Sequence, residues 1–261
     1  MTTEGRKPVM AGNWKMNLNH LESIAYVNKL GFSLTDADYE RTEVVIFPPF
    51  VDLRSVQTVV DADHLRLTYG AQDLSAHDSG AYTGEISGPM LNKLKVKYAL
   101  IGHSERRAYH NETDELVNSK VKAAIKHDLT PMIAVGETLE IRQSGNAIDH
   151  TLNQLQIALK DIRANYIPQI VIAYEPVWAI GTGEVATPED AQEMSKSIRE
   201  KIAKLYSDEA ADKIRILYGG SVKPGNIKAI MEQPDVDGAL VGGAALDPEE
   251  FLRIIRWPDQ P

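Results

Sequence analysis

Eight short apolar runs, set at similar intervals along the chain, constrain the fold more than any other feature of the sequence. They lie at residues 9–11, 44–46, 65–69, 98–101, 132–135, 170–173, 214–217 and 238–241. Their length and β-branched content are typical of strands buried on both faces, as the strands of a parallel sheet are. Longer stretches with helical apolar spacing separate them. The sequence therefore predicts a repeated strand–helix unit.

The clearest helix begins after Thr187. That residue is expected to cap the helix, Pro188 suits the first helical position, and Glu189 and Asp190 favour the positive end of the helix dipole. Its apolar face reads Ala191, Met194, Ile198, Ile202 and Leu205. Two further helices are expected at residues 113–126 and 147–162.

Eight such units in 261 residues match the size of a single (β/α)8 barrel with eight parallel strands. No linker or composition shift divides the chain, so residues 1–261 are predicted to form one domain of the α/β class. A doubly wound open sheet is the structural alternative. Against it, no run is followed by a Gly-x-Gly-x-x-Gly fingerprint or by the Gly-Lys-Ser/Thr ending of a P-loop.

Charge and cysteine content exclude several function classes. A formal net charge of −9 and a pI near 5.3 disfavour nucleic-acid and anionic membrane partners, so an anionic ligand needs a local positive site. The absence of cysteine excludes disulfides, thiolate metal sites and a cysteine nucleophile, and fits a reducing compartment. The polar residues 1–8 lack a signal-peptide core, and no apolar run is long enough for a bilayer. A cytoplasmic protein is expected.

In a (β/α)8 barrel the active site lies at the carboxyl ends of the strands, so polar residues just after each run are the candidates. Asn13 and Lys15 follow the first run. A lysine there is able to project a cation into the barrel mouth, and Asn13 is able to donate to a substrate oxygen. Taken alone, a surface lysine beside a structural asparagine is the commoner explanation.

His103 and Glu105 follow the fourth run. We expect Ser104 to cap the next helix, which places the His103 imidazole near a helix N-terminus and disfavours its charged form. A neutral imidazole is able to donate a hydrogen bond to a carbonyl. Glu105 is a candidate partner of Lys15, although a salt bridge with a neighbouring arginine is an equal alternative, and most lone histidines are structural.

Glu175 ends the sixth run. A buried acid is costly unless it is paired or used, and burial raises its pKa towards the value that a base working near neutrality needs. The next residues are apolar yet contain Gly181, as expected of a lid that excludes water and offers backbone N–H groups. The alternative is a Pro-Gly loop beside a salt-bridged acid.

Two Gly-Gly steps follow the seventh and eighth runs. Gly219 and Gly220 precede Ser221, and Gly242 precedes Gly243. Either pair alone fits a tight turn. Both together leave backbone amides bare at the two strand ends where barrels often bind phosphate, so a phosphate site is favoured.

Together these segments resemble the triosephosphate isomerase family. The resemblance covers essentially the whole chain and rests on five motifs in order at the expected strand ends: Asn13-Trp14-Lys15-Met16-Asn17, Gly102-His103-Ser104-Glu105-Arg106-Arg107, residues 173–183, Tyr218-Gly219-Gly220-Ser221 and Val241-Gly242-Gly243. Each motif is modestly specific by itself. Chance does not readily place all five at the correct strand ends.

The resemblance implies interconversion of dihydroxyacetone phosphate and D-glyceraldehyde 3-phosphate through an enediolate, without a metal or an organic cofactor. It implies that Glu175 moves the carbon-bound proton, that neutral His103 polarises the carbonyl and that Lys15 supplies positive charge. It also implies a set of supporting residues: Asn13 positions the substrate, Glu105 orients Lys15, and the phosphate rests on Gly181, Ser221, Gly242 and Gly243.

The resemblance further implies a mobile lid at residues 176–186, with Tyr218 and Ser221 as latches of its closed form. Residues 72–85 are similar to the family's projecting loop, which implies a homodimer in which Thr83 props the neighbouring active site.

Three departures from the family pattern are visible. Asp73 replaces a common asparagine, Glu184 a common basic residue and Ala245 a common serine. None of the three removes a catalytic group, but Asp73 leaves the details of the interface open and Glu184 bears on how the lid moves.

The sequence leaves other functions open. A metal-dependent epimerase or a Schiff-base aldolase would need metal ligands inside the barrel or a lysine within a strand, and neither is evident. A catalytically silent sugar-phosphate-binding barrel is the alternative from a different class.

Overall fold

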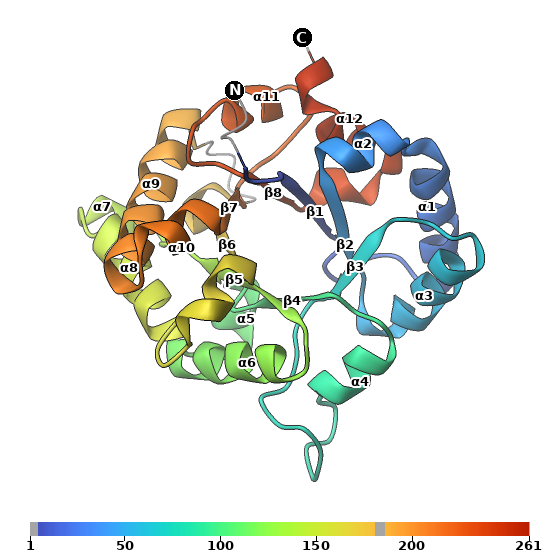
Figure 1. Ribbon diagram of the computed structural model, residues 1–261, viewed down its shortest axis with the longest axis horizontal. Coiled ribbons are helices and arrows are strands. Elements are labelled where there is room, and N and C mark those ends of the chain that lie inside the picture. The colour runs from blue at the N-terminus through green and yellow to red at the C-terminus, as the bar shows by residue number, and fades with distance from the viewer. Residues whose placement is uncertain (1–4, 181–185, 261) are drawn as a thin grey trace.

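The computed structural model describes residues 5–180 and 186–260, and its eight strands close into a parallel barrel in the order β1 to β8 (Figure 1). β1 pairs with both β2 and β8, which closes the sheet and rules out the doubly wound alternative. The strands span β1 Val9–Asn13, β2 Glu43–Phe47, β3 Thr68–Ala71, β4 Tyr98–Ile101, β5 Thr130–Val135, β6 Val171–Tyr174, β7 Arg215–Tyr218 and β8 Gly238–Val241.

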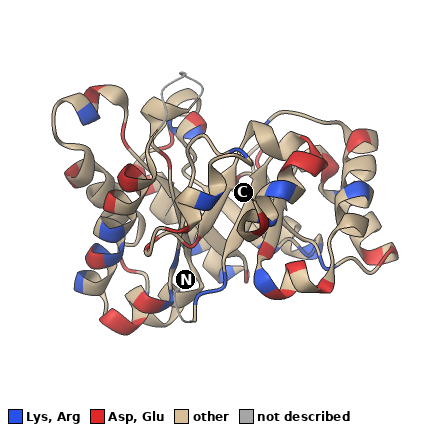
Figure 2. Ribbon diagram, turned by 90° about the horizontal axis from the view of Figure 1, so that it is seen from above, with Lys and Arg blue, Asp and Glu red and all other residues tan. Residues whose placement is uncertain are grey.

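Helices surround the barrel on all sides in Figure 1. The α-helices are α1 His20–Ser33, α2 Asp36–Arg41, α3 Leu53–Ala62, α4 Gly88–Lys93, α5 Ser104–Tyr109, α6 Asp114–Lys126, α7 Leu139–Gln143, α8 Ala147–Ala158, α9 Pro188–Leu205, α10 Asp208–Lys213, α11 Ile227–Met231 and α12 Pro248–Ile255. Short 3-10 helices lie at η1 Phe50–Asp52, η2 Ala164–Gln169, η3 Val177–Ala179, η4 Gly243–Leu246 and η5 Trp257–Asp259. Figure 2 shows acidic and basic residues interspersed over these outer helices.

Side-chain alternation along each strand builds two cores. On β1, Val9 and Ala11 point into the barrel, whereas Met10 joins the layer between strands and helices. Because both faces are apolar, the strands read as continuous apolar runs. The barrel interior is filled, so chemistry is confined to its carboxyl end.

Most expected elements are confirmed, with shifted ends. Thr187 caps α9 in a capping box with Asp190, as predicted, and α6 begins after Thr113. α8 ends at Ala158, four residues early, and the backbone reverses at Asp161 with a φ of 62°. The third strand starts at Thr68 rather than at residue 65, because Leu65 packs on the outer helix α1 at Gly31.

A ring of four charged side chains joins three segments beside the barrel mouth. Lys120 on α6 contacts Asp73 at 2.6 Å and Glu112 at 2.5 Å, and Arg106 on α5 contacts Glu112 at 2.5 Å and Asp73 at 2.8 Å. Two cations thus balance two anions. The departure at Asp73 supplies one of these buried charges and ties the start of the projecting loop to α5.

No helix among the described residues combines the length and the apolar character that a bilayer-spanning segment requires.

Candidate active site

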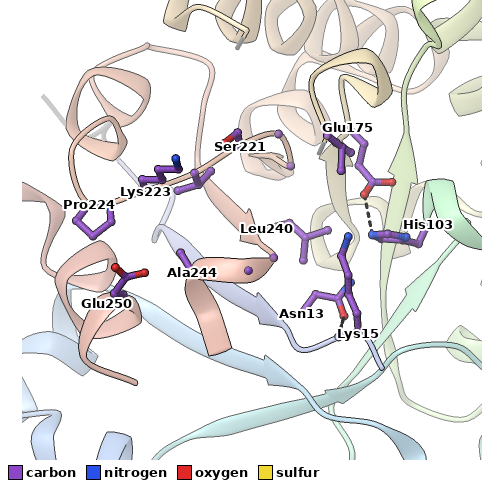
Figure 3. Close-up of a pocket in the computed structure, with 16 residues that line it drawn as sticks. Asn13, Lys15, His103, Glu175, Ser221, Lys223, Pro224, Leu240, Ala244 and Glu250 are labelled. Atoms are coloured by element: carbon purple, nitrogen blue, oxygen red, sulfur yellow. Dashed lines mark hydrogen bonds and ion pairs between the residues drawn. The ribbon is translucent and has the colours of Figure 1, made fainter. Parts of the chain in front are cut away.

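A cavity of about 570 Å³ opens at the carboxyl end of the barrel. It is lined by most of the residues that the sequence singled out: Asn13, Lys15, His103, Glu175, Ser221, Gly242 and Gly243. Figure 3 shows Glu175 facing His103 across one end, with Lys15 rising from β1 beside them. The predicted phosphate ligand Gly181 and the departure at Glu184 lie outside the described residues.

Glu175 directly follows β6 and is 2% exposed. Its Oε1 lies 2.9 Å from His103 Nε2, and its Oε2 accepts the Ser104 backbone N–H at 2.9 Å. The Glu175 carboxylate is therefore bound at the start of α5. Gly136 and Gly219 allow this close approach, since a Cβ at Gly136 would lie 1.8 Å from the Glu175 carbonyl oxygen and one at Gly219 would lie 3.1 Å from Glu175 Cγ.

His103 caps α5 with its own ring. Its Nδ1 accepts the Glu105 backbone N–H at 3.2 Å, so the prediction that Ser104 caps this helix is wrong and Ser104 is the first helical residue. A ring nitrogen that accepts a hydrogen bond carries no proton. The neutral tautomer therefore has its proton on Nε2, the atom that faces Glu175.

The pKa values of this pair depend on their contact. Burial raises the pKa of Glu175, but His103 and the Ser104 N–H lower it by more, so the net direction is downward. Burial lowers the pKa of His103, whereas the Glu175 carboxylate raises it, and the net direction is upward. For this arrangement two sequence-based expectations are thus wrong: that the pKa of Glu175 is raised, and that the charged form of His103 is disfavoured.

We expect the pKa of His103 to fall in Glu175→Gln. The amide keeps the shape of the carboxylate but loses the charge that raises the imidazole pKa, so burial and Lys15, which lower the pKa, are opposed only by the weaker effect of Glu105. Titration by ¹⁵N NMR of the imidazole should give a lower pKa in the variant than in the wild type. His127, which pairs with Asp78, is the internal control. An unchanged His103 titration would contradict this account.

Lys15 occupies a strained backbone position. Its φ of 53° lies in the left-handed region, which costs a residue other than glycine about 1–3 kcal/mol. Asn13 Oδ1 accepts the Lys15 backbone N–H at 3.0 Å, and Gln72 Nε2 donates to the Lys15 carbonyl at 2.8 Å. Lys15 Nζ contacts Glu105 Oε1 at 2.6 Å, so the predicted pair is formed. The sequence pointed to Gln72 only as part of a loop.

The two Gly-Gly pairs differ in the free space around them. A Cβ at Gly220 would lie 2.1 Å from the Tyr218 hydroxyl, so packing explains this glycine. A Cβ at Gly243 would meet nothing within 4 Å, and one at Gly242 would make only an ordinary contact with Lys15. The second step thus opens onto free space at the start of η4, as an anion site requires. Ala245, at the third departure, packs against Gly12.

Trp178, near the start of the predicted lid, is held by contacts to the residues after β5. Trp178 Nε1 donates to the buried Glu137 at 2.8 Å, and Arg142 lies over the Trp178 ring while it contacts Asp190 at the start of α9. The Tyr218 hydroxyl is buried and has no hydrogen-bond partner among the described residues. It is therefore available to a further partner, as a latch must be.

A closed (β/α)8 barrel with a buried carboxylate, an imidazole and a lysine beside bare glycine amides defines a barrel enzyme of phosphorylated substrates. The sequence model of the triosephosphate isomerase family matches residues 8–257. The chain therefore belongs to the triosephosphate isomerase family.

Curated relatives agree over the full chain. A triosephosphate isomerase of Streptomyces coelicolor is 64% identical over 260 residues, which is 100% of both chains. Those of Mycolicibacterium vanbaalenii and Mycobacterium tuberculosis are 60% and 58% identical over 249 residues, with 95% of each chain covered.

Proposed function

We propose that this protein interconverts dihydroxyacetone phosphate and D-glyceraldehyde 3-phosphate by proton transfer through an enediolate. The observation that carries the proposal is the contact of Glu175 with His103 at the end of a cavity that also holds Lys15 and the Gly242-Gly243 amides. Membership of the triosephosphate isomerase family supports it. No observation favours a catalytically silent barrel.

The phosphate is proposed to rest on the N–H groups of Gly242 and Gly243 and on the Ser221 hydroxyl, with Gly181 as a further donor from the lid. These groups lie on the loops after β7 and β8, where the start of η4 adds its partial positive charge. Anchoring the phosphate here directs the carbon chain towards Glu175 and His103, because these two residues form the reacting end of the same cavity (Figure 3).

The substrate carbonyl is proposed to take the place of the Glu175 carboxylate at His103 Nε2. Once the carboxylate leaves, burial and Lys15 lower the pKa of His103 against the smaller upward effect of Glu105, so the imidazole is neutral and its Nε2–H donates to the substrate oxygen. Lys15 Nζ, oriented by Glu105, stabilises the negative charge that develops on that oxygen. Asn13 holds the Lys15 backbone and thereby places this cation.

Glu175 is proposed to remove a proton from one substrate carbon and to return it to the neighbouring carbon, while His103 moves the hydroxyl proton from one substrate oxygen to the other. Leaving the Ser104 N–H and His103 removes the two contacts that lower its pKa, so burial then raises its basicity. A closed lid over residues 176–186 protects the enediolate from water, with Tyr218 and Ser221 as its latches. The chemistry needs proton transfer and fixed dipoles only, and calls for no cofactor.

A coupled isomerase assay on the chelator-treated protein tests the proposal. We expect turnover of both triose phosphates that is unchanged by the chelator and leaves no adduct after borohydride treatment. Binding of the substrate without turnover would instead identify a silent barrel. Loss of turnover with the chelator would identify a metal-dependent enzyme.

The proposal includes a homodimer formed through the projecting loop at residues 72–85. Gln72 Nε2 donates to both the Lys15 and the Phe47 carbonyls, so the loops after β1, β2 and β3 adjoin one another. These loops expose Met16, Val51 and Tyr82 at 95%, 80% and 45% of their surfaces. Burial of such side chains favours association, and Thr83 is proposed to reach the partner's site.

Met16→Glu is expected to weaken this dimer. The charge would have to be buried without a partner, so the sedimentation coefficient should fall to that of a monomer and the activity per chain should fall on dilution. Phe32→Glu is the matched control, because Phe32 is also exposed but lies near the end of α1. A dimer of wild-type affinity in Met16→Glu would exclude this interface.

The proposal also treats residues 1–261 as one catalytic domain, supported by the pairing of β1 with β8. The cytoplasm is the proposed location, since a chain without cysteine suits a reducing compartment.

A further inference from the structure

Two charged side chains of the active-site cavity have no role in the proposed chemistry. Lys223 and Glu250 line the cavity together with Pro224 and Ala244. Figure 3 shows them at the end opposite to Glu175 and His103, beyond Ser221. The proposed phosphate anchor therefore lies between the reacting end and a second, charged end.

The two lysines of the cavity differ in how they are neutralised. Lys15 Nζ is 2.6 Å from the Glu105 carboxylate, whereas no carboxylate of the described residues lies within ion-pair distance of Lys223 Nζ. Glu250 has Arg253 as a neighbour at 3.7 Å and is nearly half exposed. Among the described lining residues, Lys223 is thus the lysine whose charge is left for a ligand.

The backbone of Lys223 is fixed relative to the phosphate anchor. Asn226 Oδ1 accepts the Lys223 N–H at 2.8 Å, and Asn226 Nδ2 donates to the Ser221 carbonyl at 2.9 Å. Pro224 restricts the next φ angle. The side chain is exposed and extends from a defined turn two residues after Ser221.

A phosphate monoester carries nearly two negative charges at neutral pH, because its second pKa is about 6. A chain of net charge −9 repels such a ligand, so capture depends on local cations. An exposed, unpaired lysine at the rim of a cavity attracts an anion without having to be desolvated. An acid on the same rim opposes it.

We propose that Lys223 is a specificity-determining residue that draws the dianionic phosphate of the substrate to the Ser221, Gly242 and Gly243 anchor, and that Glu250 opposes this attraction. The inference rests on the proposed function. Lys223 acts on substrate capture and not on the reacting carbons, so it affects kcat/KM and leaves kcat unchanged.

Charge substitutions test the inference at low ionic strength. Lys223→Gln should lower kcat/KM for D-glyceraldehyde 3-phosphate about threefold, Lys223→Glu should lower it further, and Glu250→Gln should raise it. Lys223→Arg should restore wild-type behaviour. All differences should shrink as salt is added, because screening weakens exposed charges.

Lys204→Gln is the matched control. It removes the same charge from the last turn of α9, at the end of the barrel opposite to the cavity, and should leave kcat/KM unchanged. Glyceraldehyde, which lacks the phosphate, is the second control, and its turnover should not respond to Lys223→Gln. Equal effects of Lys223→Gln and Lys204→Gln, or equal losses with both substrates, would overturn the inference.

Inorganic phosphate separates this inference from the proposed function. Its dissociation constant, measured by calorimetry, should rise about threefold in Lys223→Gln and fall in Glu250→Gln whether or not the protein turns over triose phosphates. Unchanged phosphate affinity in both variants would contradict the role of Lys223. Absence of wild-type isomerase activity would contradict the proposed function alone.

Discussion

Replacement of Glu175 by aspartate should lower kcat at least about a hundredfold and change KM little, because a displacement of about 1 Å at a reacting group has this effect. The substitution keeps the charge and the position directly after β6 but withdraws the carboxylate by one methylene. The phosphate anchor and Lys15 are untouched, so binding persists. Loss of transition-state contact alone lowers kcat and kcat/KM together.

Glu140→Asp is the control for this experiment, since Glu140 is an exposed glutamate of α7 that makes no contact with the cavity. Glu175→Gln should lower kcat more than Glu175→Asp does, because it removes the general base, whose contribution is typically about 10²–10⁴-fold. A kcat within twofold of the wild type in Glu175→Asp would show that another group moves the proton.

Replacement of Lys120 by methionine should destabilise the fold by about 3–5 kcal/mol, the cost of leaving buried charges without their partner. Lys120 is buried and contacts both Asp73 and Glu112. Without it, Arg106 alone faces two buried carboxylates. Urea unfolding at a fixed protein concentration measures the loss, because association contributes to the apparent stability of an oligomer.

Lys122→Met is the matched control. Its ammonium group is exposed and lies 3.6 Å from Asp161, so the change should be within about 1 kcal/mol. The loss of stability in Asp73→Asn should lie between those of Lys120→Met and Lys122→Met, because the amide keeps the shape of the ring but leaves an excess positive charge. A loss below about 1 kcal/mol in Lys120→Met would mean that the ring contributes nothing to stability.

Much of the fold could be predicted from local sequence. Parallel strands buried on both faces leave continuous apolar runs, and the capping box of α9 is written in neighbouring residues, Thr187 and Asp190. The third strand was misplaced because Leu65 and Leu67 satisfy the same apolar pattern. Only the packing of Leu65 on α1 decides where that strand begins.

Some features of the site could likewise be predicted from local sequence, and others depend on contacts between distant segments. Asn13, Lys15, His103 and Glu175 could be found because each stands at or just after the end of a strand. The hydrogen bond from the Ser104 N–H to Glu175 could not be predicted, because it depends on a side-chain rotamer and on two strands that are distant in sequence. Nor could the pairing of Asp73 with Lys120, which joins residues 47 positions apart.

Nothing in the sequence indicated a functional role for Lys223 or Glu250. A lysine before Pro224 and a second glutamate at the start of α12 each read as an ordinary surface charge. Only their common position on one cavity, together with the absence of a described carboxylate near Lys223, distinguishes them.

If Glu175 carries the proton between the two substrate carbons, incorporation of deuterium from the solvent depends on this residue. Dihydroxyacetone phosphate in D₂O, followed by ¹H NMR, should gain deuterium at the reacting carbon and form D-glyceraldehyde 3-phosphate with the wild-type protein. The role of Glu175 as the base predicts exchange that is slower by about 10²–10⁴-fold with Glu175→Gln at the same concentration. Exchange at the wild-type rate in that variant would contradict it.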